Sequence, residues 1–194
     1  MGVSDLELAE LLNGNKIAGS RDELVDRYKM QEQRVTVQNW PILDDVIRWI
    51  SVKAIVTALT AKPEAFKAQW GKAGESGSTY AGEWIGMLRD ITIRDMVLGV
   101  IADAQEPINV AENAATLATL TPDTDLPRIA GFAAFLSAMA GDSGARTWQM
   151  LEYAAGDSLG ALVEGGYRKG LHPDEFRLVA IQGKKIPEKQ MGAA

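Results

Sequence analysis

The sequence predicts an all-α protein that folds as a single compact domain of short antiparallel helices, and three observations support this prediction. Apolar residues recur at three- and four-residue steps over most of the chain, which is the period of a helix face. Prolines precede these apolar runs, as expected at the first helical position, where a missing N–H is tolerated. Glycines follow the runs, and glycine suits the left-handed conformation that ends many helices.

Two apolar patterns characterise the N-terminal part of the chain. A short amphipathic stripe at residues 6–12 follows Ser4, which is a suitable N-cap. A longer stripe over residues 42–59, which includes Trp49, predicts a helix that faces the core. The Gly- and Ser-rich stretch 71–78 predicts a linker or a surface loop. Five prolines are expected to start helices: Pro41, Pro63, Pro107, Pro127 and Pro173.

Regularly spaced glycines indicate a zigzag of antiparallel helices, similar to a hairpin repeat, in the C-terminal half. The predicted helices are 127–140, 143–155 and 158–169, followed by Gly141, Gly156 and Gly170. The first of them is almost entirely apolar, so we expect it to form the centre of the core. Only residues 35–37 and 177–181 suggest short strands. We expect an N-terminal helical portion, 1–83, packed as one domain with a second portion, 84–194.

Composition excludes several classes of function. The chain has 194 residues, 20 Lys and Arg against 26 Asp and Glu, and a formal net charge of −6, which argues against a nucleic-acid partner. It has no Cys and one His, so we expect no disulfide, no metal and no cofactor site built on thiolates or several histidines. No stretch approaches the ~20 apolar residues of a membrane span, and residues 1–12 lack the basic start of a signal peptide. We therefore predict a cytoplasmic protein without membrane contact.

From Trp84 onward, short phrases follow in a characteristic order. They are RD at 89–90 and 94–95, AAFL at 133–136, GDSGA at 141–145, LE at 151–152, SL at 158–159 and GLHP at 170–173. Residues 84–176 thereby resemble the C-terminal helical half of an actinobacterial family, domain of unknown function 4192. That family's N-terminal α/β half has no counterpart in residues 1–83. The resemblance implies a helical fold and an actinobacterial or actinophage origin, and it supplies no activity.

Three motifs imitate catalytic ones without their context. GDSL at 156–159 spells the nucleophile block of the GDSL hydrolases, but the Asp-x-x-His element that should contain His172 is absent. A nucleophilic serine needs a base that a third group orients, so we interpret Asp157 and Ser158 as helix caps. GDSG at 141–144 lacks the upstream His of a serine protease. GKAGESGST at 71–79 carries the letters of a P-loop in the wrong order.

The candidate interaction residues are aromatic side chains at element edges and one ion pair. We interpret Trp49 and Trp148, which lie on apolar stripes, as core residues. Tryptophans at edges are candidates for an exposed apolar patch that contacts a partner. Adjacent Arg and Asp side chains form either a binding pair or a structural cap. The resulting candidates are Trp40, Trp70, Trp84, Arg94 and Asp95.

These observations lead to one functional hypothesis and one alternative. The first is a non-catalytic helical interaction protein that binds a protein partner or itself as a homo-oligomer. The alternative is a small-molecule-binding protein or minor hydrolase with a pocket near Ser158 and His172. The two hypotheses differ in whether those two side chains approach each other.

Overall fold

A computed structural model describes residue 26 and the ranges 28–31, 34–37, 44–70, 79–104, 107–142 and 144–190. Within these ranges the chain forms nine helices and no β-strand, which confirms the all-α prediction. The helices are α3 (Asp45–Thr60), α4 (Pro63–Trp70), α5 (Tyr80–Met87), α6 (Ile91–Ala104), α7 (Pro107–Leu120), α8 (Leu126–Met139), α9 (Ala145–Tyr153), α10 (Ser158–Arg168) and α11 (Pro173–Gln190). Residues 6–12 and 71–78, Pro41 and Trp40 lie outside the described residues.

Proline and glycine mark the helix limits as the sequence predicts. Pro63, Pro107 and Pro173 are the first residues of α4, α7 and α11, and Pro127 is the second residue of α8. The three predicted stops all have positive φ angles, of 77° at Gly141, 86° at Gly156 and 71° at Gly170. Non-glycine residues rarely adopt this conformation, so each glycine ends its helix and allows the chain to reverse.

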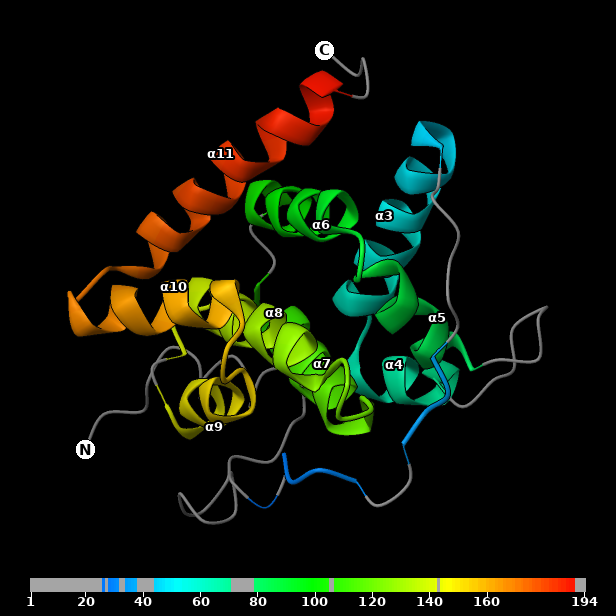
Figure 1. Cartoon of the computed structure of the whole chain (residues 1–194), viewed down its shortest axis with the longest axis horizontal. Coiled ribbons are helices and arrows are strands. Elements are labelled where there is room, and N and C mark those ends of the chain that lie inside the picture. The colour runs from blue at the N-terminus through cyan, green and yellow to red at the C-terminus, as the bar shows by residue number, and fades with distance from the viewer. Residues whose placement is uncertain are drawn as a thin grey trace.

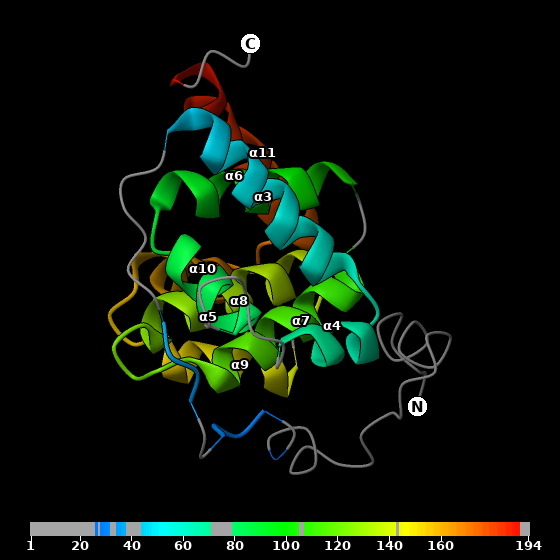
Figure 2. The ribbon, with the colours of Figure 1, turned by 90° about the vertical axis from the view of Figure 1, so that its right-hand side faces the viewer.

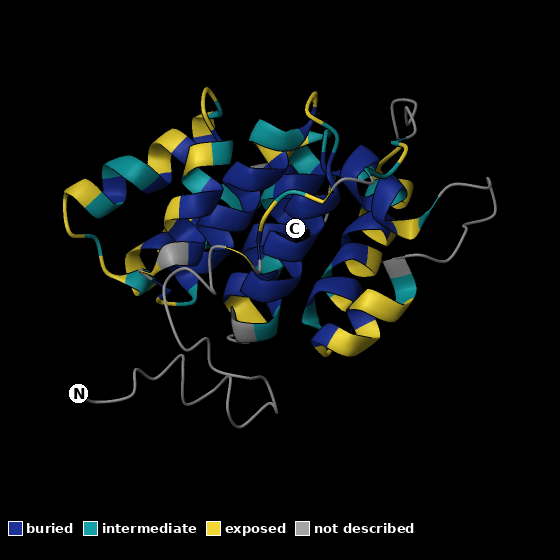
Figure 3. Ribbon diagram, turned by 90° about the horizontal axis from the view of Figure 1, so that it is seen from below, coloured by how far each residue is buried: buried dark blue, intermediate teal, exposed yellow. Residues whose placement is uncertain are grey.

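Helix α8 is the centre of the fold (Figure 1). Every residue from Ile129 to Met139 is buried, because α7, α9, α10 and α11 all pack against this helix. Phe132 has no exposed surface and Phe135 almost none. The buried residues concentrate in these central helices, whereas exposed residues lie on the outer ones (Figure 3). The prediction of a central helix over 127–140 is thus confirmed.

Helix α3 faces the core from the side of α6. It crosses α6 and also contacts α7 (Figure 2). Its buried face consists of Ser51, Val52, Ile55, Ala58 and Leu59. The N-terminal half of α3 reaches beyond its neighbours, so Trp49 is exposed, and its interpretation as a core residue is wrong.

Two further expectations need correction. Trp148 is exposed on α9, where its ring lies 6.0 Å from that of Tyr167, so it is not a core residue either. Residues 177–181 form part of α11 and are helical, not extended.

The division drawn after residue 83 falls inside α5, and helices from both sides of it contribute to one continuous apolar core.

Candidate functional site

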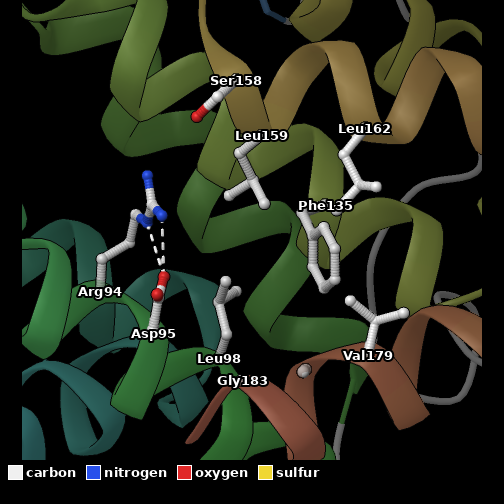
Figure 4. Close-up of a pocket in the computed structure, with 10 residues that line it drawn as sticks. Arg94, Asp95, Leu98, Phe135, Ser158, Leu159, Leu162, Val179 and Gly183 are labelled. Atoms are coloured by element: carbon white, nitrogen blue, oxygen red, sulfur yellow. Dashed lines mark hydrogen bonds and ion pairs between the residues drawn. The ribbon is translucent and has the colours of Figure 1, made fainter. Parts of the chain in front are cut away.

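A pocket of about 230 Å³ lies where α6, α8, α10 and α11 meet (Figure 4). Its lining comes from positions that are far apart in the sequence but close in the fold. The residues that line it are Arg94, Asp95, Leu98, Phe135, Ser158, Leu159, Leu162, Val179, Ala180 and Gly183. The pocket combines a polar end with an apolar wall, which is the usual composition of a small-molecule site.

The polar end is the ion pair Arg94–Asp95 on α6. Arg94 is only 8% exposed, and its Nε and Nη2 atoms donate hydrogen bonds of 2.9 and 2.8 Å to the same atom, Oδ1 of Asp95. Among the described residues, neither Nη1 of Arg94 nor Oδ2 of Asp95 has a hydrogen-bond partner. Ser158, at the start of α10, lines the same end of the pocket. The pair therefore presents the N–H donors of Nη1 and one acceptor atom, Oδ2 of Asp95.

The apolar wall is formed mainly by buried side chains. Leu98, Leu159 and Ala180 are buried, and Phe135 packs edge-on against Phe176 with ring centres 5.8 Å apart. The mouth is bordered by Leu162 and Val179, which are both exposed. Gly183 lies on the wall without a side chain to fill the space.

Ser158 is the first residue of α10, and the N-cap residue Asp157 fixes where this helix begins. The Asp157 carboxylate accepts hydrogen bonds of 2.8 and 3.0 Å from the backbone N–H groups of Leu159 and Gly160. Gly131 of α8 allows the cap to approach closely, since a Cβ at this position would overlap with Oδ2 of Asp157. The GDSL phrase therefore acts as a helix stop followed by an N-cap, in agreement with the interpretation from the sequence.

His172 takes no part in the pocket. It follows the C-terminal end of α10, whereas Ser158 begins that helix, and eleven helical residues separate the two ends by about 16 Å. The exposed imidazole has its Nδ1 atom 3.3 Å from Oδ2 of Asp174. The chain's single imidazole therefore lies away from the pocket at Ser158.

The structure places the predicted interaction residues in different environments. Arg94 and Asp95 line the pocket, whereas Trp84 is buried, with 7% of its surface exposed. Its ring stacks on Phe66 at 5.5 Å and on Tyr80 at 6.2 Å. The expectation that Trp84 belongs to an exposed apolar patch is wrong, because α4 and α5 enclose its ring. Trp70 ends α4, but its side chain lies outside the described residues, as does all of Trp40.

A second surface, missed in the sequence, lies on α3. Val46, Ile47, Trp49 and Ile50 are all exposed on the N-terminal half of this helix, and we call them the α3 patch. The patch continues into a groove of about 680 Å³ between α3, α4 and α5. The groove is lined by Ile50, Lys53, Ala54, Thr57, Ala58, Gln69, Tyr80, Glu83, Trp84 and Met87. The sequence does contain a signal for this exposed surface, because residues 42–59 are apolar on more than one helix face and only one face can pack against the core.

The ion pair of Arg48 lies on the side of α3 opposite the α3 patch. Nε of Arg48 lies 3.0 Å from Oδ2 of Asp90, just before α6. Asp90 also accepts a hydrogen bond of 2.8 Å from the N–H of Thr92 in the first turn of α6. With Arg48 held toward α6, Val46 and Ile50 lie on the opposite, exposed side of the helix.

The described ranges contain neither a candidate metal centre nor a helix that could span a membrane. No group of three or more His, Asp or Glu side chains there could hold a metal ion. None of the helices in that part of the chain has the length and apolar character needed to cross a membrane.

Comparisons with protein-family models, with curated proteins and with solved structures find no match to this chain. The resemblance of residues 84–176 to domain of unknown function 4192 therefore stays a prediction.

Proposed function

We propose that this chain is a non-catalytic interaction protein that pairs with a second copy of itself through α3. The observation that carries the proposal is the α3 patch, where four large apolar side chains are exposed within five residues. A contiguous apolar surface of this kind on a water-exposed helix is typical of an association site. Trp49 adds an aromatic anchor, a residue type that contributes strongly to interfaces.

A second copy fits this surface because the patch and the groove are complementary. The patch carries large side chains, whereas the adjoining part of α3 in the groove carries the small residues Ala54 and Ala58. In a two-fold dimer the same surface contacts itself, so two antiparallel α3 helices centred on Ile50 would place Val46 against Ala54 of the second copy. The same arrangement brings the acidic first turn at Asp45 toward Lys53 of the second copy.

The test compares two exposed apolar residues. Ile50 is 60% exposed on α3, and Leu178 is 57% exposed on α11. We expect the wild type and Leu178→Glu to have the mass of a dimer in light scattering, and Ile50→Glu to have that of a monomer with unchanged helical circular dichroism. A monomeric wild type at high concentration, or equal masses for the two variants, would overturn the proposal.

A small-molecule-binding role is the second candidate, and the pocket at Arg94 and Ser158 favours it. A buried arginine beside an apolar wall is a feature of binding sites rather than of ordinary cores. The hydrolase form of this candidate has no support, because His172 lies at the other end of α10.

We also propose a cytoplasmic location and an actinobacterial or actinophage source. The absence of Cys supports the location, because disulfide-bonded proteins are typical of oxidising compartments. The resemblance of residues 84–176 supports the source. Fractionation of cells that express the tagged protein tests the location directly.

A further inference from the structure

We propose that the pocket between α6, α8, α10 and α11 binds an uncharged amphiphile whose head group carries a hydrogen-bond donor beside an acceptor, as a primary amide does. The inference concerns a different surface from α3 and does not depend on self-association. It rests on the chemistry of the Arg94–Asp95 pair, on the apolar wall and on the size of the pocket.

The head group should be neutral because the polar end of the pocket is neutral. The charge of Arg94 is balanced by Asp95 at 2.8 Å, so an anion bound to the guanidinium would also face a carboxylate. A cation bound to Asp95 would face Arg94 in the same way. Nearby, Lys184 pairs with Asp103, and two backbone N–H groups at the start of α10 donate hydrogen bonds to the Asp157 carboxylate. A charged head would lose hydration without gaining a net opposite charge.

A head group that both donates and accepts satisfies the two free atoms of the pair. Nη1 of Arg94 needs an acceptor, and Oδ2 of Asp95 needs a donor. A primary amide offers its carbonyl oxygen to the first and its N–H to the second, while the Ser158 hydroxyl can complement either. Both hydrogen bonds would involve a charged group of the protein, and such bonds contribute more than those between two neutral groups.

The tail should be a short apolar chain. The wall presents Leu98, Phe135 and Leu159, and the mouth presents Leu162 and Val179, whose exposed surface a tail would cover. A volume of about 230 Å³ corresponds to about eight non-hydrogen atoms, if each takes the ~30 Å³ of a water molecule in the liquid. Hexanamide matches that size.

The first test is a titration with three probes of equal size, hexanamide, hexanoate and heptylammonium, followed by NMR. We expect hexanamide to bind at least about tenfold more tightly than either ion, with shifts at Leu98 and Leu159. Equal binding of all three, tighter binding of either ion, or no binding up to the solubility limit would overturn the proposal. Ile50→Glu should bind hexanamide as the wild type does, which separates this result from that for self-association.

The second test fills the pocket. A Cβ at Gly183 of α11 or at Gly165 of α10 would meet no atom within 4 Å, so leucine can be introduced at both sites. Gly183 lines the pocket and Gly165 does not. We expect Gly183→Leu to weaken hexanamide binding more than about tenfold, and Gly165→Leu to leave it unchanged. If both variants bind like the wild type, the ligand lies elsewhere and the proposal fails. Should Gly183→Leu not fold, Leu162→Trp narrows the mouth from an exposed position and replaces it in the test.

Discussion

Arg89 and Asp125 form a two-pronged ion pair that joins the turn before α6 to the start of α8. Nε and Nη2 of Arg89 donate hydrogen bonds of 2.7 and 2.8 Å to the two carboxylate oxygens of Asp125. Arg128, in the first turns of α8, donates a further hydrogen bond of 3.0 Å to the carbonyl oxygen of Arg89. These bonds fix the central helix against the segment that leads into α6, the helix that carries the polar end of the pocket.

Removal of this pair should destabilise the protein in a pH-dependent way. The hydrogen bonds from Arg89 hold the pKa of the Asp125 carboxyl below its ordinary value of 3.8. The pair therefore stabilises the folded state fully above that value, and the effect is lost as the pH falls through the lower pKa of the folded protein. We expect Asp125→Asn to lower the free energy of unfolding by about 1–3 kcal/mol at pH 7.

Urea denaturation of the wild type and Asp125→Asn between pH 7 and low pH measures this effect. The difference between them should shrink only below about pH 4. Asp123→Asn is the control. The Asp123 side chain is exposed, and its ion-pair partner Arg34 lies 3.7 Å away, which is a longer and weaker contact than that between Arg89 and Asp125. A difference that stays constant with pH would contradict the assignment.

The two tryptophans Trp84 and Trp49 should have opposite effects. Trp84 is buried and stacked on Phe66, so Trp84→Ala should cost about 3–5 kcal/mol in unfolding free energy. Trp49→Ala removes a ring that is 36% exposed, so we expect a smaller loss of unfolding free energy than for Trp84→Ala, together with weaker dimerisation. Urea denaturation and light scattering on both variants separate the roles. A stable Trp84→Ala variant would show that this ring is not part of the core.

The helix limits could be predicted because local chemistry decides them. A glycine with positive φ, such as Gly156, and a proline at a helix start, such as Pro173, impose their conformations whatever packs around them. The nearly all-apolar sequence of α8 likewise predicts a helix surrounded on every side.

The outward face of α3 and the position of Arg94 and Ser158 at the same pocket could not be predicted, for two different reasons. Residues 46–55 are apolar around most of the helix, so periodicity alone does not say that Val52 packs inward and Ile50 outward. The pocket is lined by both Arg94 and Ser158, 64 positions later, and their position at one site depends on how α6 and α10 pack around α8. The charges of Arg94 and Asp95 indicate a candidate pair, but they do not predict that the pair lies at a pocket.

The core role of Phe132 can be measured directly. Its side chain is fully buried on α8, so Phe132→Ala leaves a cavity that the surrounding helices cannot fill. We expect a loss of about 3–5 kcal/mol in unfolding free energy. Leu178→Ala is the exposed control and should change stability by less than about 0.5 kcal/mol. Similar losses for the two variants would contradict the central position of α8.

The Asp157 cap should matter for stability, and Ser158 should not matter for hydrolysis. Asp157→Ala removes two hydrogen bonds to backbone N–H groups and should cost about 0.5–2 kcal/mol. Ser158→Ala and His172→Ala should leave any hydrolysis of a simple ester unchanged, because the two side chains lie at opposite ends of α10. Thermal unfolding and an esterase assay measure these outcomes. Loss of ester hydrolysis in either variant would restore the enzyme hypothesis.

Alanine substitutions at two glycines on the facing helices α6 and α11 should change the stability of the protein in opposite directions. A Cβ on Gly99 would overlap with Cβ of Lys184, an atom close to the backbone that cannot move aside without shifting α11. Gly99→Ala should therefore cost about 1–3 kcal/mol, even though alanine is the better helix former. A Cβ on Gly183 meets no atom within 4 Å, so Gly183→Ala should gain about 0.5–1 kcal/mol.

Thermal unfolding of both glycine variants measures the closeness of α6 and α11. We expect the midpoint to fall for Gly99→Ala and to rise for Gly183→Ala. A rise in both would mean that Gly99 does not approach Lys184 as closely as described. The result also concerns the pocket. Leu98 precedes Gly99 and Gly183 precedes Lys184, and both Leu98 and Gly183 line the pocket wall where α6 and α11 meet.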